Sequence, residues 1–252
     1  MKENLVAWCI VPFDAAKRSP EDRSKMLNEL GLTRCAYDWR PEHVASFEEE
    51  IQQYQKHGIE FFAFWGEHEK AFQLFEKHDL HPQIWKMFGD PQGGSQDEKV
   101  TNAVNSLEGL AKKTAAMKCK LGLYNHGGWS GEPANLVAVC QKLHEAGHTH
   151  VGIVYNWHHG HDEIAQWADS LKLMKPYLHC LNLNGMKLGA EFKILPLSQG
   201  EHELEMLRTL IASKYEGPIG ILDHRQEVDS KVALQENLDG LSTLTKDEAA
   251  KK

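Results

Sequence analysis

The feature that most constrains the fold of this chain is a regular alternation of short apolar segments with amphipathic helical segments. Eight segments have the length and composition of buried strands, and each of the first seven precedes a segment with helical periodicity. Because helical crossovers join parallel strands, this alternation predicts a parallel sheet covered by helices. The strand-like segments are residues 5–13, 33–39, 59–65, 82–88, 120–125, 150–156, 178–184 and 217–223.

Helix-end signals support the first two helical segments. Ser19 is a suitable N-cap and Pro20 suits the first helical position. Ser46 and Glu49 have the spacing of a capping box, and Gly58 is placed to end that helix. These signals predict helices that begin after Ser19 and Ser46.

Eight strand–helix units in 252 residues predict an α/β fold, a single-domain (β/α)₈ or TIM barrel. An open doubly wound sheet is the alternative, but it usually has fewer strands, and its GxGxxG dinucleotide fingerprint is absent. We assign residues 1–242 to the barrel. Within it, residues 226–242 should form the helix after the last strand, although their helical pattern is weak. Residues 89–98 are predicted to be a loop, and residues 243–252 a polar C-terminal tail.

The net charge of −8 argues against nucleic acid or an anionic membrane as a partner, because both require a basic surface. The apolar runs are of strand length, far below the roughly 20 residues of a membrane span. A small molecule is therefore the expected partner, and the sequence leaves the oligomeric state open, a homo-oligomer included.

The five cysteines are widely spaced, without a CxxC motif, and are expected to be buried free thiols in a reducing setting. The first residues read directly into a strand without a signal peptide. We expect a cytoplasmic protein, although a chain trimmed of a secretory leader would have the same sequence.

Polar side chains gather after the strand-like segments. YNWHHGH at 155–161 places three histidines after the sixth of them. The C-terminal strand ends of an eight-stranded barrel meet on one face, where the active site lies. This pattern predicts a functional site formed by residues such as Asp38, Arg40, Glu67, Lys86, Tyr124, Asn125, His126, Asn156, His159, Asn182, Asn184, Asp223 and His224. Phe13, His158 and His161 occupy similar positions but are assigned no role.

Six of the seven tryptophans lie in strands or at strand ends. Barrel packing explains some of them, but sugar rings also stack on indole planes while their hydroxyls bind Asn, Asp and His. The six are Trp8, Trp39, Trp65, Trp85, Trp129 and Trp157.

The layout and four stretches resemble the xylose isomerase-like superfamily, which includes sugar (phosphate) isomerases and epimerases, inosose dehydratases and endonuclease IV. The stretches are LGLYNHGGW, GIVYNWHHGH, LNLNG and GILDH, at 121–129, 152–161, 181–185 and 220–224. The resemblance implies a (β/α)₈ barrel, and it implies that the barrel often binds one divalent ion. The ligands in the family are a Glu after the fifth strand, an Asp-x-x-His after the sixth, a His, Asp or Asn after the seventh and a Glu after the eighth. Such an ion polarises a carbonyl and hydroxyl pair.

This chain departs from the implied ligand set. Tyr124 stands at the usual glutamate and Asn156 at the usual aspartate, while His159 keeps the histidine position. The seventh strand offers Asn182, and the eighth offers Asp223 and His224. Amides and a neutral phenol are weak ligands for a divalent ion.

Three interpretations follow. The first is an enzyme with a divalent ion (zinc, manganese or nickel) at His126, His159 and Asp223 or His224. The second is an enzyme that uses a histidine base, with Lys86 or Arg40 holding the developing negative charge. The third is a barrel that binds a carbohydrate without converting it.

The activity that we predict is sugar isomerisation or epimerisation by proton transfer next to a carbonyl, through an enediol or enolate. A keto-sugar lyase or hydratase is the alternative. Candidate catalytic residues are His159, His126, His224, Lys86 and Glu67. Candidate substrate-binding residues are Trp8, Asp38, Arg40, Trp65, Tyr124, Asn125, Trp129, Asn156, Trp157, Asn182 and Asn184, with Asp38 also an alternative base.

Rival chemistries have weaker support. No glycine-rich phosphate cradle follows the last two strands, which favours a neutral sugar over a sugar phosphate. A hydrolase would need two carboxylates at a suitable separation, and Asp38 with Glu67 or Asp223 could form such a pair. Their separation cannot be obtained from their spacing in the sequence. DNA repair of the endonuclease IV kind conflicts with the acidic net charge.

Overall fold

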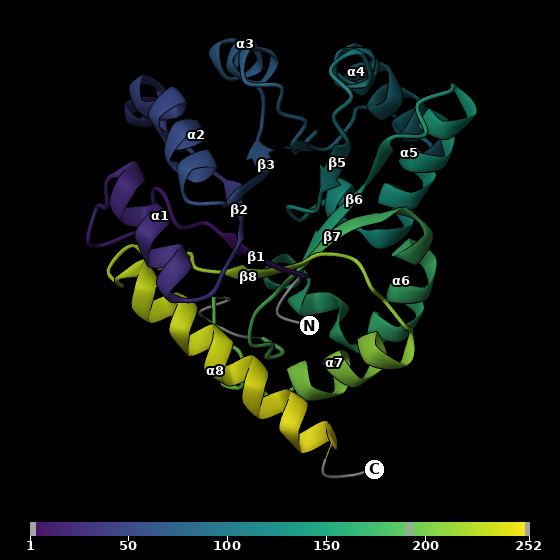
Figure 1. Ribbon diagram of the computed structural model, residues 1–252. Coiled ribbons are helices and arrows are strands. Elements are labelled where there is room, and N and C mark those ends of the chain that lie inside the picture. Colours follow the sequence, from purple (N-terminus) through teal and green to yellow (C-terminus); the bar gives the residue numbers. More distant parts are fainter. Residues whose placement is uncertain (1–3, 190, 192–193, 250–252) are drawn as a thin grey trace.

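The strands form a closed eight-stranded parallel barrel in the order β1 to β8, and helices form a ring around it (Figure 1). The structure is a computed structural model that describes residues 4–189, 191 and 194–249. The predicted TIM barrel is confirmed. The strands are β1 Leu5–Trp8, β2 Arg34–Tyr37, β3 Glu60–Trp65, β4 Gln83–Lys86, β5 Leu121–Tyr124, β6 Val151–Asn156, β7 Leu178–Leu183 and β8 Ile219–Leu222.

The main helices follow the strands in turn. They are α1 Pro20–Glu29, α2 Phe47–Lys56, α3 Glu69–Lys77, α4 Gln96–Ala116, α5 Pro133–Glu145, α6 Trp167–Met174, α7 Glu203–Ala212 and α8 Ser230–Ala249. Short 3₁₀ helices lie between them: η2 Pro41–Ser46, η3 Trp129–Gly131, η4 Trp157–His159, η5 His161–Gln166 and η6 Lys175–Tyr177.

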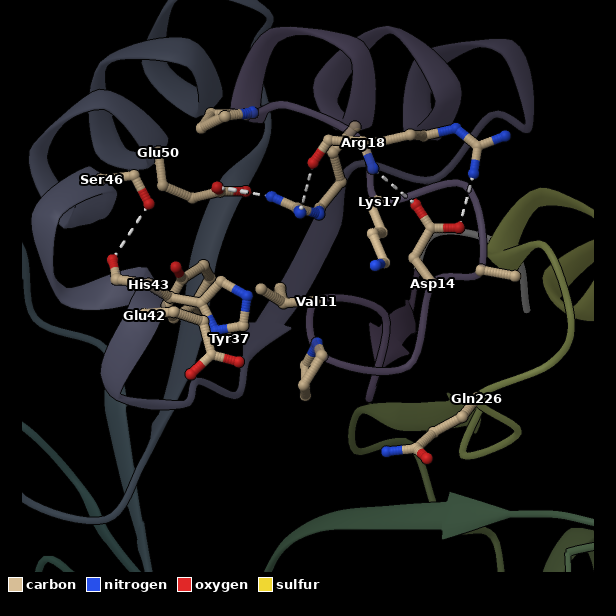
Figure 2. Close-up of a pocket in the computed structure, with 14 residues that line it drawn as sticks. Val11, Asp14, Lys17, Arg18, Tyr37, Glu42, His43, Ser46, Glu50 and Gln226 are labelled. Carbon is tan, nitrogen blue, oxygen red and sulfur yellow. Dashed lines mark hydrogen bonds and ion pairs between the residues drawn. The ribbon is translucent and has the colours of Figure 1, made fainter.

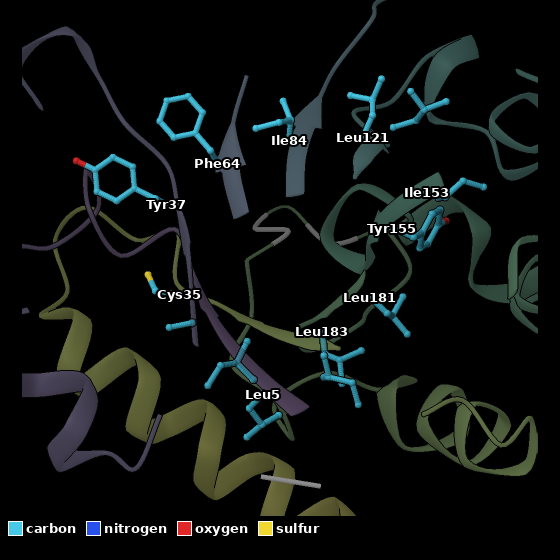
Figure 3. Packing of buried hydrophobic residues seen from close by; sticks show 14 of the residues in the cluster. Leu5, Cys35, Tyr37, Phe64, Ile84, Leu121, Ile153, Tyr155, Leu181 and Leu183 are labelled. Carbon is cyan, nitrogen blue, oxygen red and sulfur yellow. The ribbon is translucent and has the colours of Figure 1, made fainter. Parts of the chain in front are cut away.

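Strand alternation divides the buried side chains into two layers. Leu5, Tyr37 and Ile153 point outward and pack between the strands and the helices (Figure 3). Trp8 and Trp85 point inward and belong to the smaller cluster inside the barrel. Inward residues near the C-terminal strand ends therefore form the floor of any site at the barrel mouth.

The first strand is shorter than the expected 5–13. Cys9 adopts a left-handed backbone with φ 59°, which ends β1 after Trp8. Residues 9–13 thus become part of the loop above the barrel, and Cys9 and Phe13 can face its mouth.

Both predicted helix starts are confirmed, because α1 begins after Ser19 and α2 begins after Ser46, but only Ser19 caps its helix through its side chain. The Ser19 hydroxyl accepts a hydrogen bond from the Asp22 amide and caps α1. The Ser46 hydroxyl instead donates to the His43 carbonyl, because η2 leads directly into α2 without a side-chain cap. The capping box that the structure does contain is Ser95 with Glu98, so α4 begins inside the predicted loop 89–98.

Much of the predicted polar tail, residues 243–249, is helical in the structure. Helix α8 continues through residues 243–249, and Leu244 is only 6% exposed and belongs to the outer core. Residues 250–252 lie outside the described residues. The polar residues around it make Leu244 the one large apolar side chain of residues 243–249, too weak a pattern to predict a helix from the sequence.

All five cysteines are buried and free, as predicted. Among the described residues, no helix has both the length and the apolar character needed to cross a membrane.

Candidate functional site

A cavity of about 100 Å³ lies at the C-terminal mouth of the barrel. It is smaller than the roughly 300–1,000 Å³ typical of small-molecule pockets, so it can enclose only part of a sugar-sized ligand. The lining residues are the last residues of β1, β3 and β5 together with residues that follow β1, β2, β5, β6 and β8: Trp8, Cys9, Phe13, Asp38, Arg40, Trp65, Tyr124, His126, His158, His159 and His224.

Four histidines lie close together along one side of this cavity. The ring centroids of His158 and His159 are 3.6 Å apart, and those of His126 and His159 are 4.3 Å apart. His224 lies 5.7 Å from His158 and contacts Phe13 at 3.9 Å. The structure therefore brings together the three predicted catalytic histidines, although their sequence positions span about 100 residues.

Two of these imidazoles, those of His158 and His224, have pKa values that favour the neutral form. Burial, reinforced by the neighbouring histidines, holds the pKa of His158 well below its usual range. Burial, Arg40 and His126 lower the pKa of His224. The Nδ1 atoms of both rings have no hydrogen-bond partner among the described residues, so they are available to a ligand.

Asp38 lies directly after β2 and points into the same cavity. Its side chain is buried, and neither oxygen has a hydrogen bond of normal geometry among the described residues. Burial raises its pKa to about 7, a shift that Arg40 and the nearby amides of Asp38 and Val11 only partly oppose. A carboxyl group with this pKa can both accept and release a proton near neutral pH.

Arg40 supplies the cationic group of the cavity. Its guanidinium lies 5.2 Å from the ring centroid of Phe13 and donates to the Trp39 carbonyl at 2.7 Å. Because Arg40 remains charged at all relevant pH values, it can stabilise an anion that forms beside Asp38 or His224.

The floor of the cavity is aromatic. Trp8 packs against Trp65 and Trp85 with ring centroids 5.6 and 4.8 Å apart, and Trp65 meets Tyr124 at 4.5 Å. These rings fill the barrel interior below the mouth. They explain why the cavity is shallow.

Tyr124 joins the floor to β6. Its hydroxyl group accepts a hydrogen bond from the Asn156 side-chain amide and one from Trp8 Nε1 at 3.4 Å. Asn156 also bonds through its backbone to Asn125, and its Oδ1 accepts the His158 amide at 3.3 Å. Asn125 and Asn156 thus shape the loop that carries the histidines, without lining the cavity themselves.

Several other predicted residues lie away from the cavity. Lys86 and Glu67 form an ion pair at 2.6 Å with both side chains partly exposed. Trp157 is fully buried against Trp167 in the outer core, and the Trp129 indole donates to Gln96.

The two asparagines after β7 are also fully buried and do not line the cavity. Asn182 Oδ1 accepts a hydrogen bond from the Cys180 thiol, and Asn184 donates to the Gly185 carbonyl. Their polarity suggested ligand contacts in the sequence, but in the structure they hold the backbone around β7.

Sequence reasoning assigned no role to three lining residues, Cys9, Phe13 and His158. His158 and Phe13 lie at the ends of strand-like segments, so their positions in the sequence could have indicated that they line the barrel mouth. Cys9 lay within an expected strand, and only the left-handed turn at this residue brings it to the mouth.

The predicted metal ligands do not form a metal site. Across residues 4–189, 191 and 194–249, no group of three or more His, Cys, Asp or Glu side chains is arranged to hold an ion. Asp223 accepts hydrogen bonds from the Ser230 hydroxyl and the Arg225 amide, and Tyr124 is bonded to Asn156. The usual ligand positions thus hold a phenol, two amides, the His159 imidazole and a carboxylate already engaged in hydrogen bonds, a set that fits a divalent ion poorly.

Solved structures share the fold of this chain over nearly its whole length. A 3-keto-D-glucoside 4-epimerase from E. coli matches with a TM-score of 0.69 and 14% identity, over 96% of this chain and 99% of that chain. The IolI protein with a bound zinc atom matches with a TM-score of 0.73 and 12% identity, over 96% and 97%. A xylose isomerase domain-containing protein from Salmonella typhimurium gives 0.73 and 12%, over 97% and 98%.

No protein-family model and no curated protein matches the sequence. At 11–14% identity to the solved structures, the likeness establishes the fold.

Proposed function

We propose that this chain, which has the xylose isomerase-like barrel fold, is an enzyme that moves a proton at a carbon next to a carbonyl in a carbohydrate. The observation that carries the proposal is the environment of Asp38. This buried carboxyl group has no hydrogen-bond partner among the described residues, has a pKa of about 7, and lies in one cavity with Arg40 and four histidines. General acid–base groups work best with a pKa near the operating pH.

In the proposed reaction Asp38 removes the proton from the carbon beside the carbonyl and leaves an enediolate. Arg40 stabilises the negative oxygen, the role that it was predicted to share with Lys86. Lys86 and Glu67 are not included, because they pair with each other outside the cavity lining.

The histidines complete the proton transfer. His159, His126 and His224 line the cavity beside His158. A neutral imidazole can donate a hydrogen bond to a sugar hydroxyl from one nitrogen and accept one at the other. Return of the proton to the same carbon gives epimerisation, and return to the neighbouring carbon gives isomerisation. Loss of a hydroxyl from the same enediolate would give the keto-sugar lyase reaction.

The small cavity favours a substrate whose reacting end alone enters the barrel mouth. Trp65 lies over the buried Trp8 with its ring plane inclined by 47°, and the partly exposed Trp65 ring offers a surface on which the C–H face of a sugar can stack. The remainder of the substrate would lie outside, above the loops.

The test is solvent isotope exchange. Chelator-treated protein is incubated in D₂O with aldoses, ketoses and keto-glycosides, and loss of the C–H signal next to the carbonyl is followed by NMR. We expect exchange with at least one substrate class, and a decrease of about 10²-fold or more in Asp38→Asn. Asp79→Asn, at an almost fully exposed carboxylate, is the matched control.

Exchange that Asp38→Asn leaves unchanged would contradict the role of Asp38. The shallow cavity also favours a second candidate, a barrel that binds carbohydrate without converting it. Saturable sugar binding at the barrel mouth, with no exchange in any substrate class, would support that candidate instead.

A further inference from the structure

A second and larger cavity, of about 600 Å³, lies outside the barrel wall. It is bounded by the loop between β1 and α1 on one side and by η2 and α2 on the other. Figure 2 shows Glu42, His43 and Ser46 facing Asp14 and Arg18 across it, with Lys17 between them. The volume is in the range of small-molecule sites, whereas the barrel-mouth cavity is not.

The wall of the barrel separates the two cavities. Tyr37 is the last residue of β2 and points outward, and the next residue, Asp38, points inward. A ligand in the outer cavity would therefore not contact Asp38 or the histidines.

The floor of the outer cavity holds a buried ion pair. Arg23 donates to Glu50 Oε2 at 2.6 Å, and the two side chains are 4% and 1% exposed. Arg23 also donates to the Arg18 carbonyl at 2.9 Å. The pair is therefore fixed in position from both sides.

Three polar atoms of this floor have no hydrogen-bond partner among the described residues: Arg23 Nε, Glu50 Oε1 and the Tyr37 hydroxyl. Tyr37 is 1% exposed and lines the same cavity as Arg23 and Glu50. Native proteins rarely leave buried polar groups unpaired, and a group of three indicates that a bound molecule completes their hydrogen bonds.

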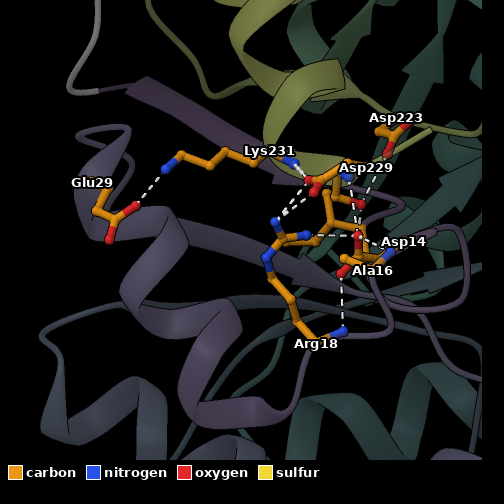
Figure 4. Close-up of polar contacts among 9 residues, drawn as sticks. Asp14, Ala16, Arg18, Glu29, Asp223, Asp229 and Lys231 are labelled. Carbon is orange, nitrogen blue, oxygen red and sulfur yellow. Dashed lines mark hydrogen bonds and ion pairs between the residues drawn. The ribbon is translucent and has the colours of Figure 1, made fainter.

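The loop above the floor is held rigidly. The Asp14 carboxylate accepts hydrogen bonds from the Ala16, Arg18 and Ser230 amides and pairs with the Arg18 guanidinium at 2.7 Å (Figure 4). Within this loop Lys17 has a left-handed backbone with φ 47°, a conformation that costs energy in a residue with a side chain. The exposed side chains of Lys17, Glu42 and Gln226 lie at the rim.

The charges that line the cavity cancel. Its acidic groups are Asp14, Glu42 and Glu50, and its basic groups are Lys17, Arg18 and Arg23. Burial lowers the pKa of His43, which leaves that ring neutral at neutral pH. The cavity thus has no excess charge for an anion or a cation, but many separate donors and acceptors.

We propose that this cavity is a second binding site, for a neutral polyhydroxylated molecule such as a monosaccharide or a cyclitol. A hydroxyl group both donates and accepts, so one hydroxyl can donate to Glu50 Oε1 and accept from Arg23 Nε, and a neighbouring one can pair with the Tyr37 hydroxyl. Lys17, Glu42 and Gln226 can bind the outer hydroxyls. This proposal does not depend on the activity proposed for the barrel mouth.

The test is titration of the full chain with D-glucose and with myo-inositol, followed by protein NMR shifts. We expect saturable binding by at least one probe and a loss of about tenfold in affinity in Tyr37→Phe, which removes only an unpaired hydroxyl. Tyr155→Phe is the matched control, because that hydroxyl is also buried and unpaired but does not line this cavity. Lys17→Ala, at an exposed rim residue, should also weaken binding without affecting the fold.

The proposal is overturned if neither probe binds the wild-type chain, which would leave water as the occupant. It is also overturned if Asp38→Asn weakens binding while Tyr37→Phe and Lys17→Ala do not, since the probe would then occupy the barrel mouth. An equal loss in Tyr155→Phe would show that the effect of Tyr37→Phe is not local.

Discussion

At the scale of single residues, the site depends on a carboxyl group in an unfavourable environment. Asp38 is buried without a hydrogen-bond partner among the described residues, and its pKa is about 7 in place of the usual 3.8. A native fold keeps such a group only where other interactions outweigh its cost. Functional sites are the common location of such residues.

The raised pKa predicts that Asp38→Asn stabilises the protein at high pH. The unfolded chain releases the Asp38 proton near pH 3.8 and the folded chain near pH 7, so wild-type stability falls as the pH rises through this window and stays lower above it. We expect the variant to be more stable at about pH 8, by at most about 4 kcal/mol, with little difference at about pH 4.

Thermal unfolding at both pH values checks this prediction, with Asp79→Asn as the control at an exposed site. A wild-type chain as stable as Asp38→Asn at high pH would mean that the carboxylate is well solvated in the fold.

The sequence predicted part of the site at this scale. His126, His159, His224, Asp38 and Arg40 were expected at the barrel mouth because strand ends converge there, and the structure places them together. Sequence position cannot distinguish a side chain that faces the cavity from one that faces the core. This is why Trp157 and Asn182, which have the same position and polarity as true lining residues, were included.

At the scale of elements, the buried pair Arg23–Glu50 joins α1 to α2 behind the barrel wall. This pair was not predictable from the sequence, because both residues lie in helices rich in charged residues, where an exposed side chain is the usual expectation. The same ambiguity concealed the start of α4 at Gln96 and the continuation of α8 through Leu244.

We predict that Glu50→Gln destabilises the fold by about 3 kcal/mol or more, because Arg23 keeps its charge in a buried place without its partner. Glu21→Gln, in an exposed pair with Lys25, should change stability little, because solvent screens exposed ion pairs. Urea unfolding of the two variants measures the difference, and equal effects would show that the Arg23–Glu50 pair is solvated.

At the scale of the whole molecule, one closed barrel carries two cavities of different kinds. The alternation of strands and helices was sufficient to predict the barrel, since few other folds accommodate eight such units. The boundary of the last helix was not predictable from composition. Its final turns are held by tertiary packing of Leu244 rather than by a marked apolar face.

Leu244→Ala should therefore destabilise the whole barrel by about 2 kcal/mol, as expected for truncation of a buried leucine near the edge of a core. Ser242→Ala, at an exposed position of the same helix, should leave the melting temperature unchanged. A Leu244→Ala variant as stable as wild type would show that residues 243–249 do not contribute to the stability of the barrel.

The most direct test of the proposed chemistry is the titration of Asp38 itself. Carbon-13 NMR of protein labelled at aspartate, with the Asp38 signal identified by its absence in Asp38→Asn, reports this pKa in the folded chain. We expect a midpoint near 7, where a carboxyl group can both take and return the proton of a sugar carbon. A midpoint near the ordinary 3.8 would contradict this expectation, because Asp38 would then be a solvated anion and the barrel mouth would lack its acid–base group.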